Sequence, residues 1–257
     1  IDERQLFVPA FQREYVWTNR QWKRMVEELE IIVNGEDSNR FLGAVIAVRR
    51  EANPSMPQPF EIVDGQQRLS TLYLFMMAAI WVAAKNGHDN YAQGLIRKYL
   101  IIDWYEAGTN TKLIPSFSDR NQFCKAFDQL INTGALTDWL GHKTKLPSRS
   151  GNDNGKYLTQ FWKIRKYLQE RYTEHGYDHL NEIVEAATTK LTFVFILLKD
   201  PSSATTVFEG LNDSGVPIGI GDLVRNEVFS KISNEPDRAQ YVHEHVWLPF
   251  RDKLGDG

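Results

Sequence analysis

One five-residue segment of the sequence combines residue types that suit phosphate chemistry. Residues 64–68 read Asp-Gly-Gln-Gln-Arg and stand between a β-rich run and a long apolar run, which predicts a strand, a tight turn and the start of a helix. Free backbone N–H groups and the dipole at a helix start attract anions, above all phosphate. Arg68 falls in the first helical turn, where the dipole disfavours a cation. We therefore expect its guanidinium to grip a phosphate in a two-pronged geometry.

The other residues of this turn have roles at such a site. Gly65 lets the backbone bend and lets a ligand approach without a Cβ in the way. Asp64 can hold a magnesium ion or orient a water molecule, whereas Gln66 and Gln67 can position water or contact the edge of a base or sugar. The alternative is structural: Asp64 caps the helix and Arg68 forms a surface ion pair. The spacing alone leaves both interpretations open.

The N-terminal segment offers a second candidate arm for the same chemistry. Arg13 has aromatic neighbours at positions 11, 15 and 17, so its guanidinium can stack on a ring and still present its donors. The alternative is a segment that covers the core, with the Arg13 side chain extending along it to reach water.

A third segment, residues 208–226, ends one predicted helix and begins another. The residue types at 212–215, Asn-Asp-Ser-Gly, predict a helix stop and a turn, and Asp222 predicts the next N-cap. This structural role explains Arg225 and Asn226 less well, so both stay candidates for ligand contact.

The composition is that of an ordinary globular chain. With 257 residues, 42% hydrophobic and 25% charged, it is neither disordered, collagen-like nor a coiled coil, and it fits one large domain or two unequal ones. The net charge is −3, so any contact with nucleic acid needs a local basic patch. Lys156, Lys163 and Lys166 form such a patch on one predicted helix. The alternative is an ordinary solvated helix face.

The cysteine and histidine content excludes several kinds of site. The single cysteine, Cys124, excludes an internal disulfide and a cysteine-rich zinc site, and it favours a reducing compartment. Because it falls in a predicted helix, we interpret it as a structural thiol. Of the six histidines, His175 and His179 are four residues apart, but Gly176 between them weakens a helical metal pair. We therefore expect no histidine metal site.

The elements that must position these residues can be predicted from periodicity. Thr18 and Gln21 form a capping box, and the helix they begin should end at residues 34–35, Asn-Gly. The apolar run 69–84 should be a helix buried on most sides, since it is too short to span a bilayer. The remaining predictions are a hairpin of strands 41–48 and 60–63, helices 91–101, 118–131, 156–172 and 179–190, a polar loop 141–155 of a kind that is often mobile, and a fully buried strand 191–198.

Four motifs occur in the order that is typical of one family. They read VPAFQREYVW, FLGAVIAV, VDGQQRLSTL and FEGLNDSGVPIGIGDLVRN, and together they extend over nearly the whole chain. The sequence therefore resembles the N-terminal domain of GmrSD-type restriction proteins. The resemblance implies an α+β fold: a ParB/sulfiredoxin-like mixed-sheet unit that binds nucleotide in residues 1–85, and a mainly helical region with one buried strand in residues 86–257.

The resemblance also implies an activity and its residues. It implies that residues 64–68 bind and hydrolyse a nucleoside triphosphate with Mg²⁺, and that this hydrolysis regulates cleavage of modified DNA by an HNH nuclease domain or subunit. The implied catalytic residues are Asp64, also the tentative Mg²⁺ ligand, with Gln67 and Arg68. The implied nucleotide-binding residues are Gly65, Gln66, Gln67, Arg68, Arg13, Tyr15, Asn212, Arg225 and Asn226.

One departure from the family pattern limits what this chain is expected to do. No HNH-like set of histidines occurs, so we do not expect the chain to cut DNA by itself. It starts at Ile1 without a methionine, and we expect a fragment of a longer, bacterial cytoplasmic protein that could form homo-oligomers, without a membrane partner. Two functions stay open. One is a triphosphatase that licenses restriction, and the other is a DNA- or partner-binding module in which the nucleotide is only a switch ligand.

Overall fold

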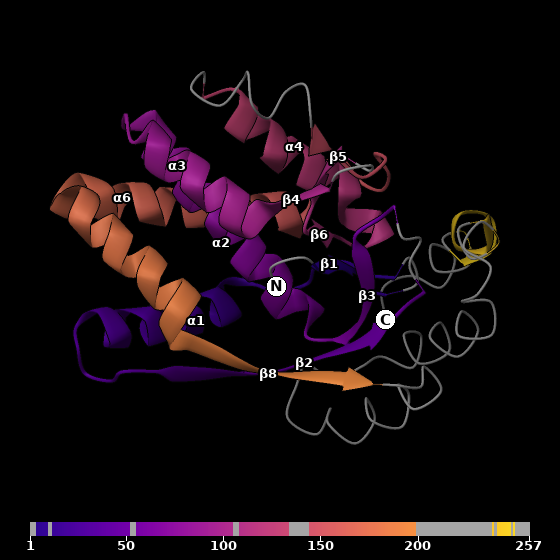
Figure 1. The fold of residues 1–257 in the computed structure, drawn as a ribbon, viewed down its shortest axis with the longest axis horizontal. Coiled ribbons are helices and arrows are strands. Elements are labelled where there is room, and N and C mark those ends of the chain that lie inside the picture. Colours follow the sequence, from indigo (N-terminus) through magenta and orange to yellow (C-terminus); the bar gives the residue numbers. More distant parts are fainter. Residues whose placement is uncertain are drawn as a thin grey trace.

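The computed structural model describes residues 4–9, 12–51, 55–104, 108–133 and 144–198, together with residues 238, 241–247 and 249. In this part of the chain, a mixed five-stranded sheet and a small three-stranded sheet are combined with several helices (Figure 1). The expected α+β class is confirmed.

The larger sheet contains both parallel and antiparallel pairs, and its strand order is β6-β1-β3-β2-β8. Its strands are β1 (Arg4–Phe7), β2 (Arg40–Arg49), β3 (Gln58–Asp64), β6 (Leu113–Ile114) and β8 (Leu191–Leu198). Strands β2 and β3 are antiparallel, which confirms the predicted hairpin. Strand β1 is parallel to both β3 and β6, and β8 is parallel to β2. Segments from both ends of the described chain therefore complete one sheet.

The smaller sheet and the helices complete the described architecture. The smaller sheet has the order β4-β5-β7, with β4 (Ile101–Trp104), β5 (Gly108–Thr111) and β7 (Thr144–Lys145). The longer helices are α1 (Asn19–Val33), α2 (Gln66–Lys85), α3 (Asp89–Leu95), α4 (Arg120–Ile131) and α6 (Lys156–Glu185). Short π-helical turns are η1 (Ile96–Leu100), η3 (Ala186–Lys190) and η5 (His243–Trp247), and η2 (Phe117–Asp119) is a 3₁₀ turn. Figure 1 shows α2, α3, α4 and α6 on the same side of β2 and β8.

Helix α1 begins and ends as the sequence predicts. Thr18 is the N-cap, and the reciprocal bonds with Gln21 that define a capping box are both present. The helix ends at the C-cap Asn34, and Gly35 follows with a φ of 74°. Its buried residues, Trp22, Met25, Leu29 and Ile32, recur at helical spacing and face the core.

Helix α2 is the central element of the core. Leu74, Phe75 and Met77 are fully buried, and the helix packs against α3, α4 and α6. By length and composition α2 could cross a membrane, but 83% of its most apolar window is buried inside the structure, as expected for the core helix of a folded domain. Its first turn is consequently held in a fixed position relative to the sheet.

The elements predicted between residues 91 and 190 are observed, with one boundary shifted. The predicted helix 91–101 gives way to strand β4 at Ile101. The described part of the polar loop 141–155 packs against α4, because the Asn121 N–H donates to the Ser150 carbonyl at 2.9 Å and Arg149 pairs with Asp128 at 2.6 Å. The two helices predicted at 156–172 and 179–190 are confirmed: α6 consists of two helical segments separated by a kink at Gly176, where φ is 80°, and the second continues into η3.

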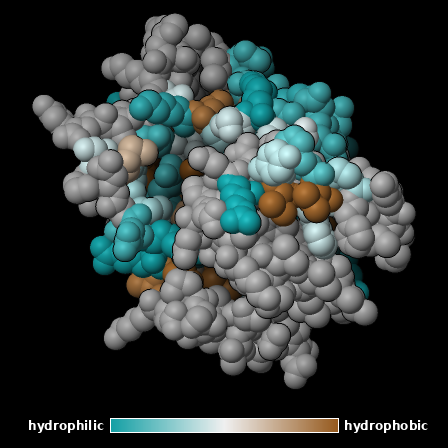
Figure 2. All heavy atoms as spheres, turned by 90° about the vertical axis from the view of Figure 1, so that its right-hand side faces the viewer, coloured by the Kyte–Doolittle hydropathy of each residue, from teal (hydrophilic) through white to brown (hydrophobic). Residues whose placement is uncertain are grey.

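Strand β8 is not the fully buried strand that its apolar run predicts. Val194 is 50% exposed and Leu197 is 47% exposed, because β8 lies at the edge of the sheet and pairs only with β2 in the described part of the chain. Figure 2 shows the hydrophobic side chains of described residues as small separate patches among hydrophilic ones.

Candidate functional site

The turn between β3 and α2 is built around Gly65. This residue is the N-cap of α2 and has a φ of 89°, which is a left-handed conformation that suits glycine. A Cβ at this position would lie 3.0 Å from the Ala44 carbonyl oxygen and 3.0 Å from Cγ2 of Val45. The expectation that Gly65 makes room for a ligand therefore needs correction, because the space beside it is filled by β2.

The first turn of α2 leaves backbone donors free of helical partners. The Leu69 N–H donates to the Gly65 carbonyl at 3.0 Å, so the preceding N–H groups, at residues 66–68, have no acceptor within the helix. No side chain caps this end, and no acidic residue lies in the first turn. The positive end of the helix dipole is thus available to an anion.

Arg68 lies against strand β2. Its Nη1 donates a hydrogen bond to the Ala44 carbonyl, and a Cβ at Gly43 would lie 3.2 Å from its Cζ. Gly43 has a φ of 104°, and its missing side chain leaves space for the guanidinium. Among the described residues Arg68 forms no ion pair, so the surface ion pair that was the alternative is not found there. Sequence reasoning missed Gly43, although a glycine inside a β-rich run signals a bulge or a close approach.

Asp64 is the last residue of β3 and is partly exposed. It is not the helix cap that the structural alternative required, because Gly65 occupies the N-cap position and no side-chain cap bond is present. No hydrogen bond or ion pair joins its carboxylate to another described residue. The carboxylate is therefore free to hold a cation or a water molecule next to the start of α2.

The donor set around this turn fits a magnesium ion only if the nucleotide supplies part of the coordination. Within the described ranges, no group of three or more His, Cys, Asp or Glu residues could hold a metal ion. Magnesium is usually bound by one or two carboxylates, with phosphate oxygens and water as the remaining ligands. Asp64 could supply one such carboxylate.

Gln67 does not have the role that was expected of it. Its Oε1 accepts hydrogen bonds from the N–H groups of Val16, at 2.8 Å, and Trp17, at 3.4 Å. Its Nε2 donates to the Glu14 carbonyl at 3.1 Å. The residue is 7% exposed, and its amide oxygen and nitrogen both bond to backbone of residues 14–17, so Gln67 fixes the N-terminal segment.

The N-terminal segment is tied to the turn at a second point. Gln12 Nε2 donates to the carbonyl of Val63, the residue before Asp64, at 3.0 Å. Arg13 therefore lies between two anchors, one at Gln12 and one at Gln67, that both hold its backbone beside residues 63–67. The structure thus brings the arm and the turn together, as the sequence predicts, through two glutamines. The Gln66 side chain is 8% exposed and forms no hydrogen bond with another described residue.

Tyr15 is a core residue and does not line an open cleft. It is 3% exposed, its hydroxyl is hydrogen-bonded to the Thr71 hydroxyl at 2.7 Å, and its ring packs edge-on against Tyr157 at 5.5 Å between centroids. Burial raises the pKa of its phenol above the ordinary range, so the hydroxyl stays protonated. The expected nucleotide contact of Tyr15 is corrected to a structural role, which is to fix the arm on the core.

A buried carboxylate, which the sequence did not single out, holds the same arm. Asp119 is 5% exposed, and its Oδ2 accepts hydrogen bonds from the Tyr15 N–H at 2.9 Å and from the Ser116 hydroxyl at 2.7 Å. Desolvation raises the pKa of this carboxyl to about 7. The two hydrogen bonds lower the pKa and offset part of this effect, whereas the negative charge of Glu14 raises it further.

We predict that Asp119 makes the stability of the chain depend on pH. The pKa of Asp119 is higher in the folded state than in the unfolded state. Its contribution to the free energy of unfolding is therefore fully present below about pH 4 and is lost as the pH rises through about 7. Asp119→Asn keeps the acceptor for the Tyr15 N–H but does not titrate. Between pH 4 and 8 the free energy of unfolding of the parent should fall by up to about 4 kcal/mol relative to that of this variant. Urea unfolding of both proteins across this range measures the difference, and parallel pH profiles would contradict the prediction.

Several predicted residues are not brought to the turn by the described structure. Asn212, Arg225 and Asn226 lie outside the described residues. Lys156, Lys163 and Lys166 lie on α6, where Lys163 donates to the Asn19 side-chain oxygen at 2.7 Å.

Cys124 is a buried residue of α4, as predicted. It is 1% exposed, its thiol lies 3.5 Å from the Pro147 carbonyl, and burial raises its pKa, so the reactive thiolate is disfavoured. We expect Cys124→Ser to leave nucleotide turnover unchanged, and the thiol of the folded parent to react slowly with Ellman's reagent. Rapid modification that abolishes turnover while the circular dichroism spectrum is retained would show a functional thiol.

Comparisons with known proteins agree with the order of these motifs. A family model described as the N-terminal domain of GmrSD restriction endonuclease matches residues 1–229, which include the turn and the arm. The uncharacterized protein MJ0686 of Methanocaldococcus jannaschii is 23% identical over 273 residues, which cover 95% of this chain and 42% of that protein. The chain thus spans less than half the length of this relative.

Proposed function

Because the chain belongs to the family of GmrSD restriction endonuclease N-terminal domains, we propose that it is a nucleoside-triphosphate-binding and hydrolysing domain of a restriction system. The observation that carries the proposal is the first turn of α2. There the N–H groups of residues 66–68, which have no acceptor within the helix, the guanidinium of Arg68 and the carboxylate of Asp64, which has no partner among the described residues, occur within five consecutive residues. This arrangement suits a polyphosphate better than a neutral ligand.

In this proposal these groups have different tasks. The N–H groups and Arg68 hold phosphate oxygens, and Arg68 is itself positioned by the Ala44 carbonyl. Asp64 orients the attacking water or shares a magnesium ion with the phosphates, and that ion would neutralise developing charge. Arg13, which Gln12 and Gln67 hold beside the turn, supplies a second positive charge for the transition state.

A second candidate is a binding module in which the nucleotide is a switch ligand without turnover. One observation favours it: the side chain of Gln67, expected to act in catalysis, is hydrogen-bonded to the backbone of the arm through both its oxygen and its nitrogen. A ligand at the first turn of α2 would therefore act on the arm through Gln67, and the arm would report whether the site is filled.

Turnover separates the two candidates. We propose to incubate the purified chain with each of the four ribonucleoside triphosphates and Mg²⁺, to measure phosphate release, and to measure binding by calorimetry. Release that is lost in Asp64→Ala supports the triphosphatase. Stoichiometric binding without release supports the switch, and no binding of any triphosphate contradicts both.

The remaining elements of the proposal concern the rest of the system. Modified DNA and an HNH nuclease domain or subunit are the proposed partners, since the family description names a restriction endonuclease. In this view the nucleotide state of the chain licenses cleavage that another domain performs.

A further inference from the structure

One arginine of α6 is stacked on two tryptophans that come from different helices. The Cζ atom of Arg165 lies 4.1 Å from the ring centroid of Trp162, one turn earlier on α6, and 4.3 Å from that of Trp81 on α2. These distances are typical of cation–π contacts. Stacking uses the faces of the planar guanidinium, so the five N–H donors at its edge stay available to an acceptor.

The donors of Arg165 have no acceptor in the described part of the chain, where this side chain forms neither a hydrogen bond nor an ion pair. Other arginines in the described ranges pair with carboxylates; these are Arg40, Arg50, Arg149 and Arg171. Gln169, one turn further along α6, bonds to Asn86 and Thr173 instead. The guanidinium is thus held in place by stacking but its hydrogen-bonding capacity is unused.

Neither of the two helices offers a carboxylate within one turn of the stack. The residues three and four positions from Arg165 on α6 are Phe161, Trp162, Leu168 and Gln169, and those around Trp81 on α2 are Met77, Ala78, Ala84 and Lys85. Desolvation lowers the pKa of the Arg165 guanidinium. The cost of burying this charge is therefore not offset by an anion among the described residues.

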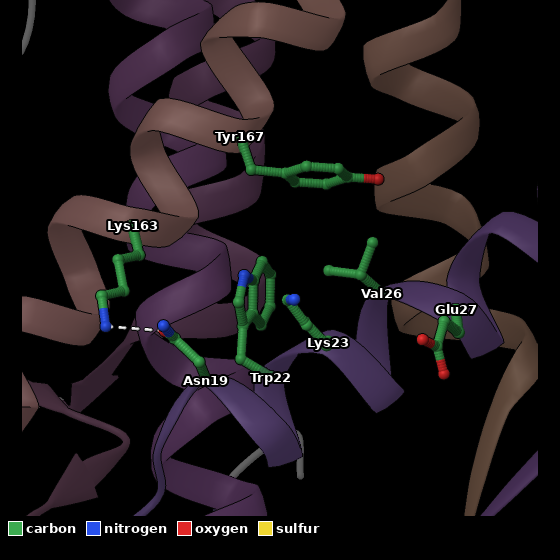
Figure 3. Close-up of a pocket in the computed structure, with 7 residues that line it drawn as sticks. All are labelled: Asn19, Trp22, Lys23, Val26, Glu27, Lys163 and Tyr167. Atoms are coloured by element: carbon green, nitrogen blue, oxygen red, sulfur yellow. Dashed lines mark hydrogen bonds between the residues drawn. The ribbon is translucent and has the colours of Figure 1, made fainter.

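The carboxylates of α1 lie on another side of α6. Figure 3 shows Lys163 and Tyr167 extending from α6 toward α1, where Lys163 donates to the Asn19 side-chain oxygen at 2.7 Å. The Tyr167 hydroxyl donates to Oε1 of Glu30 at 2.6 Å. Arg165 lies two positions from both of these α6 residues, a rotation of about 200° around the helix. It is therefore turned away from the acidic residues of α1.

We propose that Arg165, Trp81 and Trp162 form a docking site for an aspartate or glutamate side chain of a partner protein. An arginine fork can donate to both oxygens of a carboxylate at once. Because stacking already fixes the guanidinium, little side-chain entropy is lost when the carboxylate binds. Arginine and tryptophan are also enriched among the residues that dominate the energy of protein interfaces.

The surroundings favour a protein carboxylate over a nucleic-acid phosphate. A phosphate backbone is bound by a row of cations, but Lys166, the residue after Arg165, is paired with Glu170 at 3.8 Å. Lys85, one turn after Trp81, is exposed and adds one further positive charge that would attract an acidic segment. The proposal does not depend on triphosphate binding at residues 64–68.

The test measures binding of a fluorescein-labelled peptide of alternating leucine and glutamate to the whole chain by fluorescence anisotropy. The parent should bind this peptide about tenfold more tightly than the same peptide with glutamine in place of glutamate. Arg165→Gln should abolish this preference. Arg165→Lys should be intermediate, because lysine keeps the charge and the long stem but not the fork.

A local signal and a matched control separate the site from general effects of charge and folding. In the ¹⁵N-labelled parent the glutamate peptide should shift the Nε–H resonance of Arg165 and the indole N–H resonances of Trp81 and Trp162. Arg24 on α1 is exposed and has no ion pair within the described ranges, so Arg24→Gln removes the same charge elsewhere and should bind like the parent. Triphosphate turnover should be unchanged in all three variants, which keeps this proposal distinguishable from the proposed function.

Four outcomes would overturn the proposal. The parent may show no preference for the glutamate peptide, or Arg24→Gln may weaken binding as much as Arg165→Gln. Lower stability of Arg165→Gln in urea with unchanged peptide affinity would show that the stack only packs α6 against α2. Displacement of the peptide by oligodeoxythymidine, or self-association of the parent in sedimentation that is lost in Arg165→Gln, would show that a phosphate or a second copy of the chain occupies the site.

Discussion

Arg68→Ala is expected to weaken binding of nucleoside triphosphate by about 1.5–3 kcal/mol, roughly tenfold to more than a hundredfold, while the chain stays folded. The guanidinium is the one cation in the first turn of α2, so its removal deletes the main charge-assisted contact with phosphate. Loss of the bond to the Ala44 carbonyl should also lower stability, by about 1 kcal/mol. Calorimetric titration at a temperature where the variant is folded measures the affinity separately from the stability.

Two further variants test whether the fork of Arg68 or only its charge is required. Arg68→Lys keeps the charge but not the two-pronged donor, and we expect an intermediate affinity. Gly43→Ala keeps the arginine at position 68 but puts a Cβ about 3.2 Å from the Arg68 Cζ, which crowds the guanidinium. The φ of 104° at position 43 is also one that alanine disfavours. If Gly43→Ala weakens nucleotide binding as Arg68→Lys does, the position of the guanidinium over β2 is part of the site.

Asp64→Ala should impair turnover of the nucleotide, whereas Arg68→Ala should impair its binding. It removes a negative charge near the phosphates and the group that orients water or holds the metal ion. We therefore expect turnover to be abolished, with affinity nearly unchanged or tighter. Because the carboxylate has no partner among the described residues, its removal should cost little stability. If both variants bind and hydrolyse triphosphate like the parent, the assignment of residues 64–68 is wrong.

The parts of the fold that could be predicted from the sequence are those fixed by local interactions. The capping box of Thr18 and Gln21 sets the start of α1 because its bonds lie within one turn. The hairpin of β2 and β3 and the burial of α2 follow from apolar patterns that alternate or persist over a short range. Each of these signals is contained in a few consecutive residues.

The parts that could not be predicted depend on contacts between distant segments. Gly65 and Gly43 are both required by close approach of other elements, Gly65 by β2 and Gly43 by Arg68. The exposure of β8 was not predicted for a related reason. An apolar run such as residues 191–198 is compatible with a strand at the centre of a sheet and with one at its edge, and the neighbouring strands decide between them. The sequence alone therefore predicted the turn between β3 and α2, but not the partners that shape it.

Gln67 illustrates this limit most clearly, and it leads to the second large expected effect. A glutamine beside a candidate phosphate site suggests catalysis, but its amide binds the backbone of residues 14–17. Gln67→Leu would leave the Val16 N–H and the Glu14 carbonyl without partners. We expect a loss of roughly 2–4 kcal/mol of unfolding free energy and increased hydrogen exchange at the amides of residues 15–17.

The loss of turnover in Gln67→Leu should then be indirect, because Arg13 is no longer held beside the turn. Gln122→Leu is the matched control: this buried glutamine accepts a hydrogen bond from the Leu158 N–H at 3.1 Å, far in the sequence from the site. It should lose comparable stability but keep nucleotide affinity and turnover. Gln67→Glu retains the acceptor for Val16 and should be intermediate. If Gln67→Leu abolishes turnover while stability and exchange of the arm stay unchanged, Gln67 acts directly on the nucleotide, and the structural role assigned to it is wrong.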